Sequence, residues 1–91
     1  MQVRWTTPAS TDIQQITRYI RRDNPAAARR VAKIIFDTAN ALCDFPMRGR
    51  AGRITGTREC VFPGWPYILV YRVKDTAVQI LRVYHGAQDW P

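Results

Sequence analysis

Cysteine, histidine and lysine are scarce in this sequence of 91 residues. Two cysteines, Cys43 and Cys60, are too few for a disulfide framework, and they fit best as buried thiols in a reducing compartment, with one bridge between them as the alternative. His85 is the single histidine, so no spacing of histidines and cysteines resembles a zinc site. We therefore expect no metal and no cofactor.

Long apolar runs are also missing. The first 13 residues lack the continuous apolar core of a signal peptide, and no segment approaches the roughly 18 apolar residues of a membrane span. The sequence therefore predicts a cytoplasmic protein with no membrane partner. A chain of this length supports one small core, so residues 1–91 are predicted to form a single domain, which excludes a multidomain enzyme.

Acidic residues are few, because seven Asp and Glu face 14 Lys and Arg, giving a net charge of +7 at pH 7. Twelve of these 14 basic residues are arginine, whose planar array of N–H donors suits phosphate or carboxylate groups. The charge predicts a polyanion or an acidic protein as partner. The arginine excess fits directed contacts with such a partner, although genome-wide base composition produces the same bias.

The first half of the chain carries the signals of one strand and two helices. Gln2–Thr6 alternates polar and apolar residues, as a short half-buried strand does. Thr7-Pro8 provides a capping hydroxyl and a proline at the first helical position, and Asn24-Pro25 opens a second helix in the same way. This second helix is predicted to end near Leu42 or Cys43. Apolar residues recur at helical spacing in both segments, at positions 9, 13, 16 and 20 and then 31, 35 and 42.

The second half of the chain is predicted to form a loop and a sheet. Residues 47–57 contain three glycines, three arginines and no acid, which is typical of a basic loop. Arg58–Phe62, Tyr67–Val73 and Ala77–His85 have strand composition, and their short connections predict an antiparallel meander. The predicted fold is α+β, with a two-helix hairpin packed on one face of a small antiparallel β-sheet, in the order β-α-α-β-β-β, and with the first strand at the sheet edge.

The predicted sheet carries apolar residues on both faces. Two helices cover only one face, so the other face is expected to expose an apolar surface rimmed by arginines, which in a monomer marks a partner or ligand site. We assign Leu69, Leu81 and Val83 to this open surface.

The order of these elements is accompanied by short motifs spread over nearly the whole chain. They are Ala9-x-x-Asp12-Ile13, Asn24-Pro25-x-Ala27-Ala28, Phe45-Pro46-x-x-Gly49-Arg50, Gly56-Thr57-Arg58-Glu59, the strand Tyr67–Val73 and the segment Arg82–Pro91. Together they resemble the RelE/ParE superfamily of toxins from bacterial type II toxin-antitoxin modules. The resemblance implies a toxin that arrests growth and is neutralised by a cognate acidic antitoxin.

The same resemblance implies one of two targets. RelE-type members cleave messenger RNA in the ribosomal A site, whereas ParE-type members inhibit DNA gyrase without known nuclease chemistry. Tyr67 and Gly86 stand where ribonuclease members similar to this chain tend to carry an arginine and a tyrosine or basic group. The ending His-Gly-Ala-Gln is closer to ParE-type members. We therefore expect a ParE-like gyrase inhibitor that is not an enzyme.

Two alternatives remain open at the level of the sequence. The first is a RelE-like, metal-independent endoribonuclease, in which His85 acts as acid or base, Arg58 or Arg82 holds the phosphate, and Glu59 is the single glutamate available. A lone histidine at a strand end is, however, more often structural. The second alternative is a basic nucleic-acid-binding module without toxicity, which the net charge permits.

The antitoxin contact is expected to combine an apolar anchor with a basic rim. Leu69, Leu81 and Val83 would take apolar side chains of the antitoxin, whereas Arg48, Arg50, Arg53 and Arg58 would steer its acidic segment toward the toxin. Three tryptophans, Trp5, Trp65 and Trp90, are expected to pack against the core rather than to stack on nucleotides.

Overall fold

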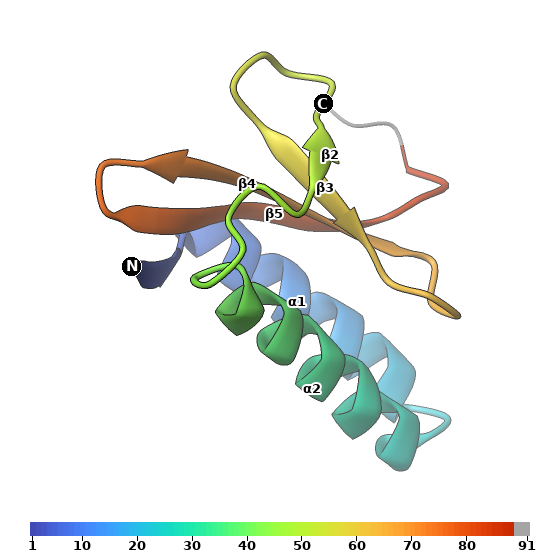
Figure 1. The fold of residues 1–91 in the computed structure, drawn as a ribbon. Coiled ribbons are helices and arrows are strands. Elements are labelled where there is room, and N and C mark those ends of the chain that lie inside the picture. The colour runs from blue at the N-terminus through green and yellow to red at the C-terminus, as the bar shows by residue number, and fades with distance from the viewer. Residues whose placement is uncertain (89–91) are drawn as a thin grey trace.

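The computed structural model describes residues 1–88. Its five strands form one mixed sheet in the order β1-β5-β4-β3-β2, and the two helices lie together on one face of that sheet (Figure 1). The predicted α+β fold is confirmed. The elements are β1 (Gln2–Trp5), α1 (Thr7–Arg21), α2 (Pro25–Ala41), β2 (Arg50–Ala51), β3 (Arg58–Val61), β4 (Tyr67–Lys74) and β5 (Ala77–His85).

Side-chain caps define where both helices begin. The Thr6 hydroxyl accepts a hydrogen bond from Ala9 N at 3.3 Å, so the cap of α1 is Thr6 rather than the predicted Thr7. The Asn24 side chain accepts from Ala27 N at 3.0 Å and caps α2 as predicted. In both helices a proline follows within the first turn, where its missing N–H removes no helical hydrogen bond.

The core lies between the helical hairpin and the sheet. Within residues 1–88, none of the helices is long and apolar enough to span a membrane. Helical side chains meet those of β4 and β5 in a buried apolar cluster that includes Ala9, Ile13, Val31, Ile35, Ala39, Leu42, Leu69, Tyr71, Val78, Ile80 and Val83.

Two features of the sheet differ from the sequence prediction. Strand β1 runs parallel to β5, with Val3 opposite Val78, so the sheet is mixed rather than wholly antiparallel. Alternation of side chains reports which faces a strand presents but carries no information on its direction. The predicted loop also contains β2, which pairs with β3 through Arg50 and Glu59, and two residues are too short to show any alternation.

A bulge in β5 changes the faces of its side chains. Val70 lies opposite Arg82 and Tyr71 opposite Ile80, so Leu81 is the additional residue. Beyond Leu81 the alternation is reversed, which puts Val83 on the same face as Ile80, under the helices. The expected position of Val83 on the open face is therefore wrong. Leu69 was also expected there, but the helices cover the face of β4 that carries Leu69 and Tyr71, so Leu69 and Val83 are both buried in the core.

Tyr71 fastens the basic loop to the core. Burial raises the pKa of this phenol, which donates a hydrogen bond to Pro46 O at 2.8 Å and accepts one from Gly49 N at 2.8 Å. A Cβ atom at position 49 would lie 2.7 Å from Tyr71 Cε1, so the close approach requires glycine. The chain entering β2 is thus held in one position by a buried side chain.

The aromatic residues and cysteines are distributed as packing groups. Trp5 and Trp65 pack against the core, and the Trp5 ring centroid lies 5.0 Å from that of Phe36. Trp90 lies outside the described residues. Cys60 is buried and Cys43 half-buried, and both are free thiols. Burial raises the pKa of Cys60, which keeps this thiol protonated at neutral pH.

Candidate functional site

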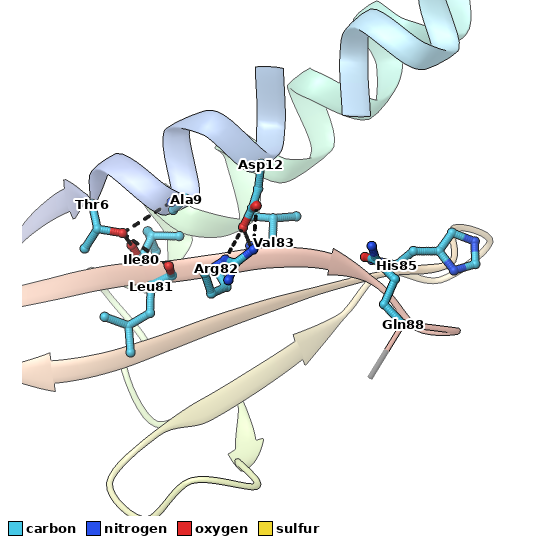
Figure 2. Close-up of polar contacts among 9 residues, drawn as sticks. All are labelled: Thr6, Ala9, Asp12, Ile80, Leu81, Arg82, Val83, His85 and Gln88. Atoms are coloured by element: carbon cyan, nitrogen blue, oxygen red, sulfur yellow. Dashed lines mark hydrogen bonds and ion pairs between the residues drawn. The ribbon is translucent and has the colours of Figure 1, made fainter. Parts of the chain in front are cut away.

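A groove of about 500 Å³ runs between α1 and the outer edge of β5. It is lined by Asp12 and Tyr19 from α1, Tyr67 from β4, and Arg82, His85 and Gln88 at the C-terminal end of the described chain. Figure 2 shows Asp12 pointing from α1 onto Arg82 and Val83, with His85 at the end of β5 and Gln88 in the turn that follows. The groove therefore lies where β5 has passed the end of β1.

Side chains from the N-terminal region of α1 occupy the backbone edge that β1 leaves unpaired. The Thr6 hydroxyl donates to Ile80 O at 2.8 Å, and Asp12 Oδ2 accepts from Val83 N at 2.9 Å. These bonds replace part of the missing strand ladder and join α1 to β5. Because the edge groups are satisfied by side chains, this stretch of β5 is a blunted edge.

Asp12 also forms a two-pronged ion pair with Arg82. Arg82 Nε donates to Asp12 Oδ2 at 2.7 Å, and a terminal nitrogen donates to Oδ1 at 2.9 Å. The carboxylate is buried, and its hydrogen bonds raise the pKa of Arg82 above the usual value. Much of the positive charge of Arg82 is thus compensated within the protein itself.

His85 is exposed and is built into a turn with the residues that follow it. Its backbone N–H donates to Gln88 Oε1 at 2.8 Å, and its ring Nδ1 accepts from Ala87 N at 3.0 Å. The imidazole also meets the Tyr67 ring edge-on, with centroids 5.8 Å apart. Since Nδ1 is occupied as an acceptor, a neutral imidazole carries its hydrogen on Nε2. Burial raises the pKa of Tyr67, so its phenol is protonated at neutral pH.

The other two candidate catalytic residues lie elsewhere, on β3. Arg58 donates to the backbone oxygen of Gly49 at 2.7 Å, which makes it a brace of the basic loop. Glu59 is buried, and it accepts from an Arg50 terminal nitrogen at 3.2 Å and from Arg53 N at 3.2 Å. Neither residue lines the groove that contains His85 and Arg82.

Sequence reasoning missed Asp12, Tyr67 and Gln88 as members of this groove. A signal for Asp12 was present, because it stands three residues after Ala9 and four before Ile16, within the apolar stripe of its helix. A carboxylate on a buried stripe requires a partner from another element. No local pattern identifies that partner as Arg82, which is 70 residues away.

Residues 3–90 match the family described as the ParE toxin of type II toxin-antitoxin systems, parDE. The chain belongs to this ParE toxin family. It is therefore a toxin of a type II toxin-antitoxin system, as the sequence resemblance implied.

Similar proteins are designated toxins. The chain is 43% identical over 90 residues to the protein designated toxin Y4kP of Sinorhizobium fredii, which covers 99% of this chain and 93% of that protein. It is 38% identical over 87 residues to toxin RelE2 of Caulobacter vibrioides, covering 96% and 97% of the two chains.

Solved structures of chains from toxin-antitoxin systems have a fold similar to that of this chain. A chain of the chromosomal ParDE system from P. aeruginosa superposes with a TM-score of 0.83 at 26% identity, covering 93% of this chain and 95% of that one. A chain of the toxin-antitoxin complex RelBE2 from Mycobacterium tuberculosis gives a TM-score of 0.62 at 31% identity, with coverages of 92% and 95%.

The residues expected to contact the antitoxin of this ParE family toxin do not form one continuous surface in the structure. Arg48, Arg50 and Arg53, which the sequence analysis assigns to the basic rim, are exposed around β2. Leu81 is half-buried and faces away from the helices, beside the turn at residues 54–57. With Leu69 and Val83 in the core, the expected apolar anchor is reduced to Leu81.

Proposed function

We propose that this toxin inhibits DNA gyrase and has no nuclease activity. The observation that carries the proposal is the dispersal of its candidate catalytic groups. A metal-free ribonuclease needs a base, an acid and a cation around one phosphate. Here Arg58 braces a loop, Glu59 is buried beside Arg50, and Arg82 is already paired with Asp12.

Of the candidate catalytic residues, His85 is the one that is not engaged, within residues 1–88, in an ion pair or in bracing a loop. It lies in the groove with Tyr67, whose ring it contacts, and its Nδ1 is used within the turn. The second proton-transfer group that a cleavage reaction requires would then be a tyrosine phenol, and burial raises the pKa of Tyr67, the phenol in contact with His85, which makes it a weak acid. The high structural similarity to the ParDE toxin also supports a gyrase target, which would place the site of action in the cytoplasm.

Neutralisation by a cognate antitoxin is the second part of the proposal. The similar solved chains come from ParDE and RelBE toxin-antitoxin systems. An acidic antitoxin suits the net charge of +7 and the exposed arginines Arg48, Arg50 and Arg53.

A RelE-like ribonuclease is the second candidate, and one observation favours it. His85, Arg82 and Tyr67 line the same groove, so a phosphate bound there would contact an imidazole and a guanidinium. The name of the Caulobacter relative, RelE2, points the same way.

Two assays with the purified toxin separate the candidates. We expect the toxin to inhibit DNA supercoiling by gyrase and to leave messenger RNA on programmed ribosomes intact. His85→Gln, which keeps a side chain with hydrogen-bonding capacity, is expected to retain the inhibition if it folds. Transcripts cut in the ribosomal A site, with cleavage reduced about 10² to 10⁴-fold in His85→Gln and gyrase unaffected, would establish the ribonuclease instead.

A further inference from the structure

A second groove, of about 480 Å³, lies on the face of the sheet opposite the helices. The chain between β2 and β3 rises from that face in Figure 1. The groove is formed by the turn at residues 54–57 of this segment together with β4 and β5. Its lining includes three cationic side chains, Arg72, Lys74 and Arg82, and the hydroxyl of Thr55, whereas the Thr57 hydroxyl already donates to Ile54 O at 2.6 Å.

Within residues 1–88, the lining of this groove includes no carboxylate. Asp75 follows Lys74 in the β4–β5 turn but is not among the residues that line the groove, and Asp12 pairs with Arg82 and accepts from Val83 N. Arg72 and Lys74 are both exposed. Within residues 1–88, Arg72 and Lys74 form no ion pair, so they are the two cations that this groove leaves available, whereas Arg82 is paired with Asp12.

Arg72 is held in position by a neutral neighbour. Its Nε donates to the Gln79 Oε1 atom at 2.6 Å across the β4–β5 pair. This bond orients the guanidinium without compensating its charge, and the two terminal nitrogens stay available as a fork of donors. Fixing the side chain beforehand lowers the entropy cost of binding an anion.

The turn that forms the outer wall is also fixed. Thr57 N donates to Ile54 O at 3.0 Å, and Gly56 has a φ of 86°, a conformation that other residues rarely adopt. Thr55 and Gly56 are therefore presented at an exposed tip facing the cations.

Positive charge continues along this face toward β2. Arg50 donates to the buried Glu59 from its side chain and Arg53 from its backbone N–H, and alternation places Tyr84 on the same face. Cationic side chains from β2, the following turn, β4 and β5 therefore share one side of the sheet. Such an extended distribution matches a ligand with regularly repeated negative charge.

We propose that this groove binds the phosphodiester backbone of a nucleic acid, and that this nucleic acid is duplex DNA. Guanidinium, ammonium and hydroxyl groups offer donors, and phosphodiester oxygens are acceptors. A peptide backbone would also bring N–H donors, and the middle of a sheet face has no free strand edge to accept them. An acidic peptide is therefore the poorer fit.

The test measures binding of a labelled 20-base-pair duplex to the purified toxin by fluorescence anisotropy over a series of salt concentrations. Gyrase is absent, so the result is independent of the proposed target. We expect Arg72→Gln/Lys74→Gln to weaken binding about tenfold and to reduce the slope of log K against log salt by about 2. The matched control, Arg29→Gln/Arg30→Gln on exposed positions of α2, removes the same charge and is expected to change affinity less than about threefold.

A charge-neutral variant tests the positioning of Arg72. Gln79→Leu keeps every cation, so the salt slope is expected to stay unchanged while affinity falls about threefold. Thermal unfolding of each variant verifies the fold. If the double variant does not fold, Gln79→Leu and the single variant Lys74→Gln still decide the question.

Three results would overturn the proposal. They are the absence of binding at low salt, equal losses in the two double variants, and tighter binding of a labelled 20-residue polyglutamate that depends on Arg72 and Lys74. A labelled single-stranded 20-nucleotide RNA is tested in the same assay, to compare RNA with duplex DNA as the ligand. If this RNA binds more tightly than the duplex, and the variants lose affinity for it to the same extent, the groove is still a phosphodiester site but its ligand is RNA.

Discussion

The helix-covered face and the open face of the sheet each bury one carboxylate, but these carboxylates hold different kinds of structure together. Asp12 joins α1 to β5 across 70 residues through a two-pronged bond to an arginine that is 37% exposed. Glu59 joins β3 to β2 across nine residues, and its partner Arg50 is 60% exposed. The comparison teaches that the helical side is tied by long-range contacts and the open side by local ones.

The largest expected difference between the faces comes from two leucines. Leu69 is fully buried against the helices, and Leu81, the bulge residue, is half-buried on the open side. Leu69→Ala is expected to lower the free energy of unfolding by about 2–5 kcal/mol through lost burial and a residual cavity. Leu81→Ala is expected to cost about 1 kcal/mol or less.

Urea denaturation of the two variants checks this pair. Similar losses would mean that the bulge does not separate the faces as described. A larger loss for Leu81→Ala would reverse the assignment of the core.

How far the sequence predicted the fold depends on the range of each signal. The caps and apolar stripes gave the helical hairpin, and the β-branched runs gave three strands, because these signals are local. The faces of Leu69 and Val83 were predicted wrongly. For Val83 the reason is that strict alternation cannot register a bulge, and a bulge at Leu81 moves every later side chain of β5 to the opposite face. For Leu69 on β4 the reason is that alternation groups it with Tyr71 but does not say which face of the sheet the helices cover.

The candidate site shows the same division between local and distant signals. His85 and Arg82 were identified from their chemistry, and the structure brings them into one groove. Arg58 and Glu59 were candidates on the same grounds, but their partners, Gly49 and Arg50, come from a loop whose path is set by buried Tyr71. Such tertiary contacts leave no periodic trace in the sequence.

A smaller effect is expected from the long-range ion pair. Asp12→Ala removes the carboxylate that accepts from Val83 N and from the Arg82 guanidinium, and we expect the free energy of unfolding to fall by about 2 kcal/mol. Asp37→Ala is the matched control, because Asp37 pairs with Lys33 on an exposed helix surface, where such pairs contribute about 0.3–0.5 kcal/mol. Both values can be measured by urea denaturation.

Comparing Asp12→Ala with Asp37→Ala also separates the effect of the Asp12 hydrogen bonds from a general effect of net charge on stability. Each substitution removes one negative charge from a protein of net charge +7. Equal losses for Asp12→Ala and Asp37→Ala would show that net charge, rather than the bonds of Asp12 to β5, determines the result.

The smallest effect is expected on the open face, from Arg50→Gln. The Arg50 side chain is largely in solvent, where water and salt screen its attraction to Glu59, and the Glu59 carboxylate keeps its bond from Arg53 N. We expect a loss of at most about 1 kcal/mol, which shrinks further when unfolding is measured at 1 M salt. A loss exceeding that of Asp12→Ala, or one that persists at high salt, would mean that the β2–β3 pair depends on a desolvated ion pair. The open face would then not differ from the helix-covered face in the way described, with sequence-local contacts on the first and long-range contacts on the second.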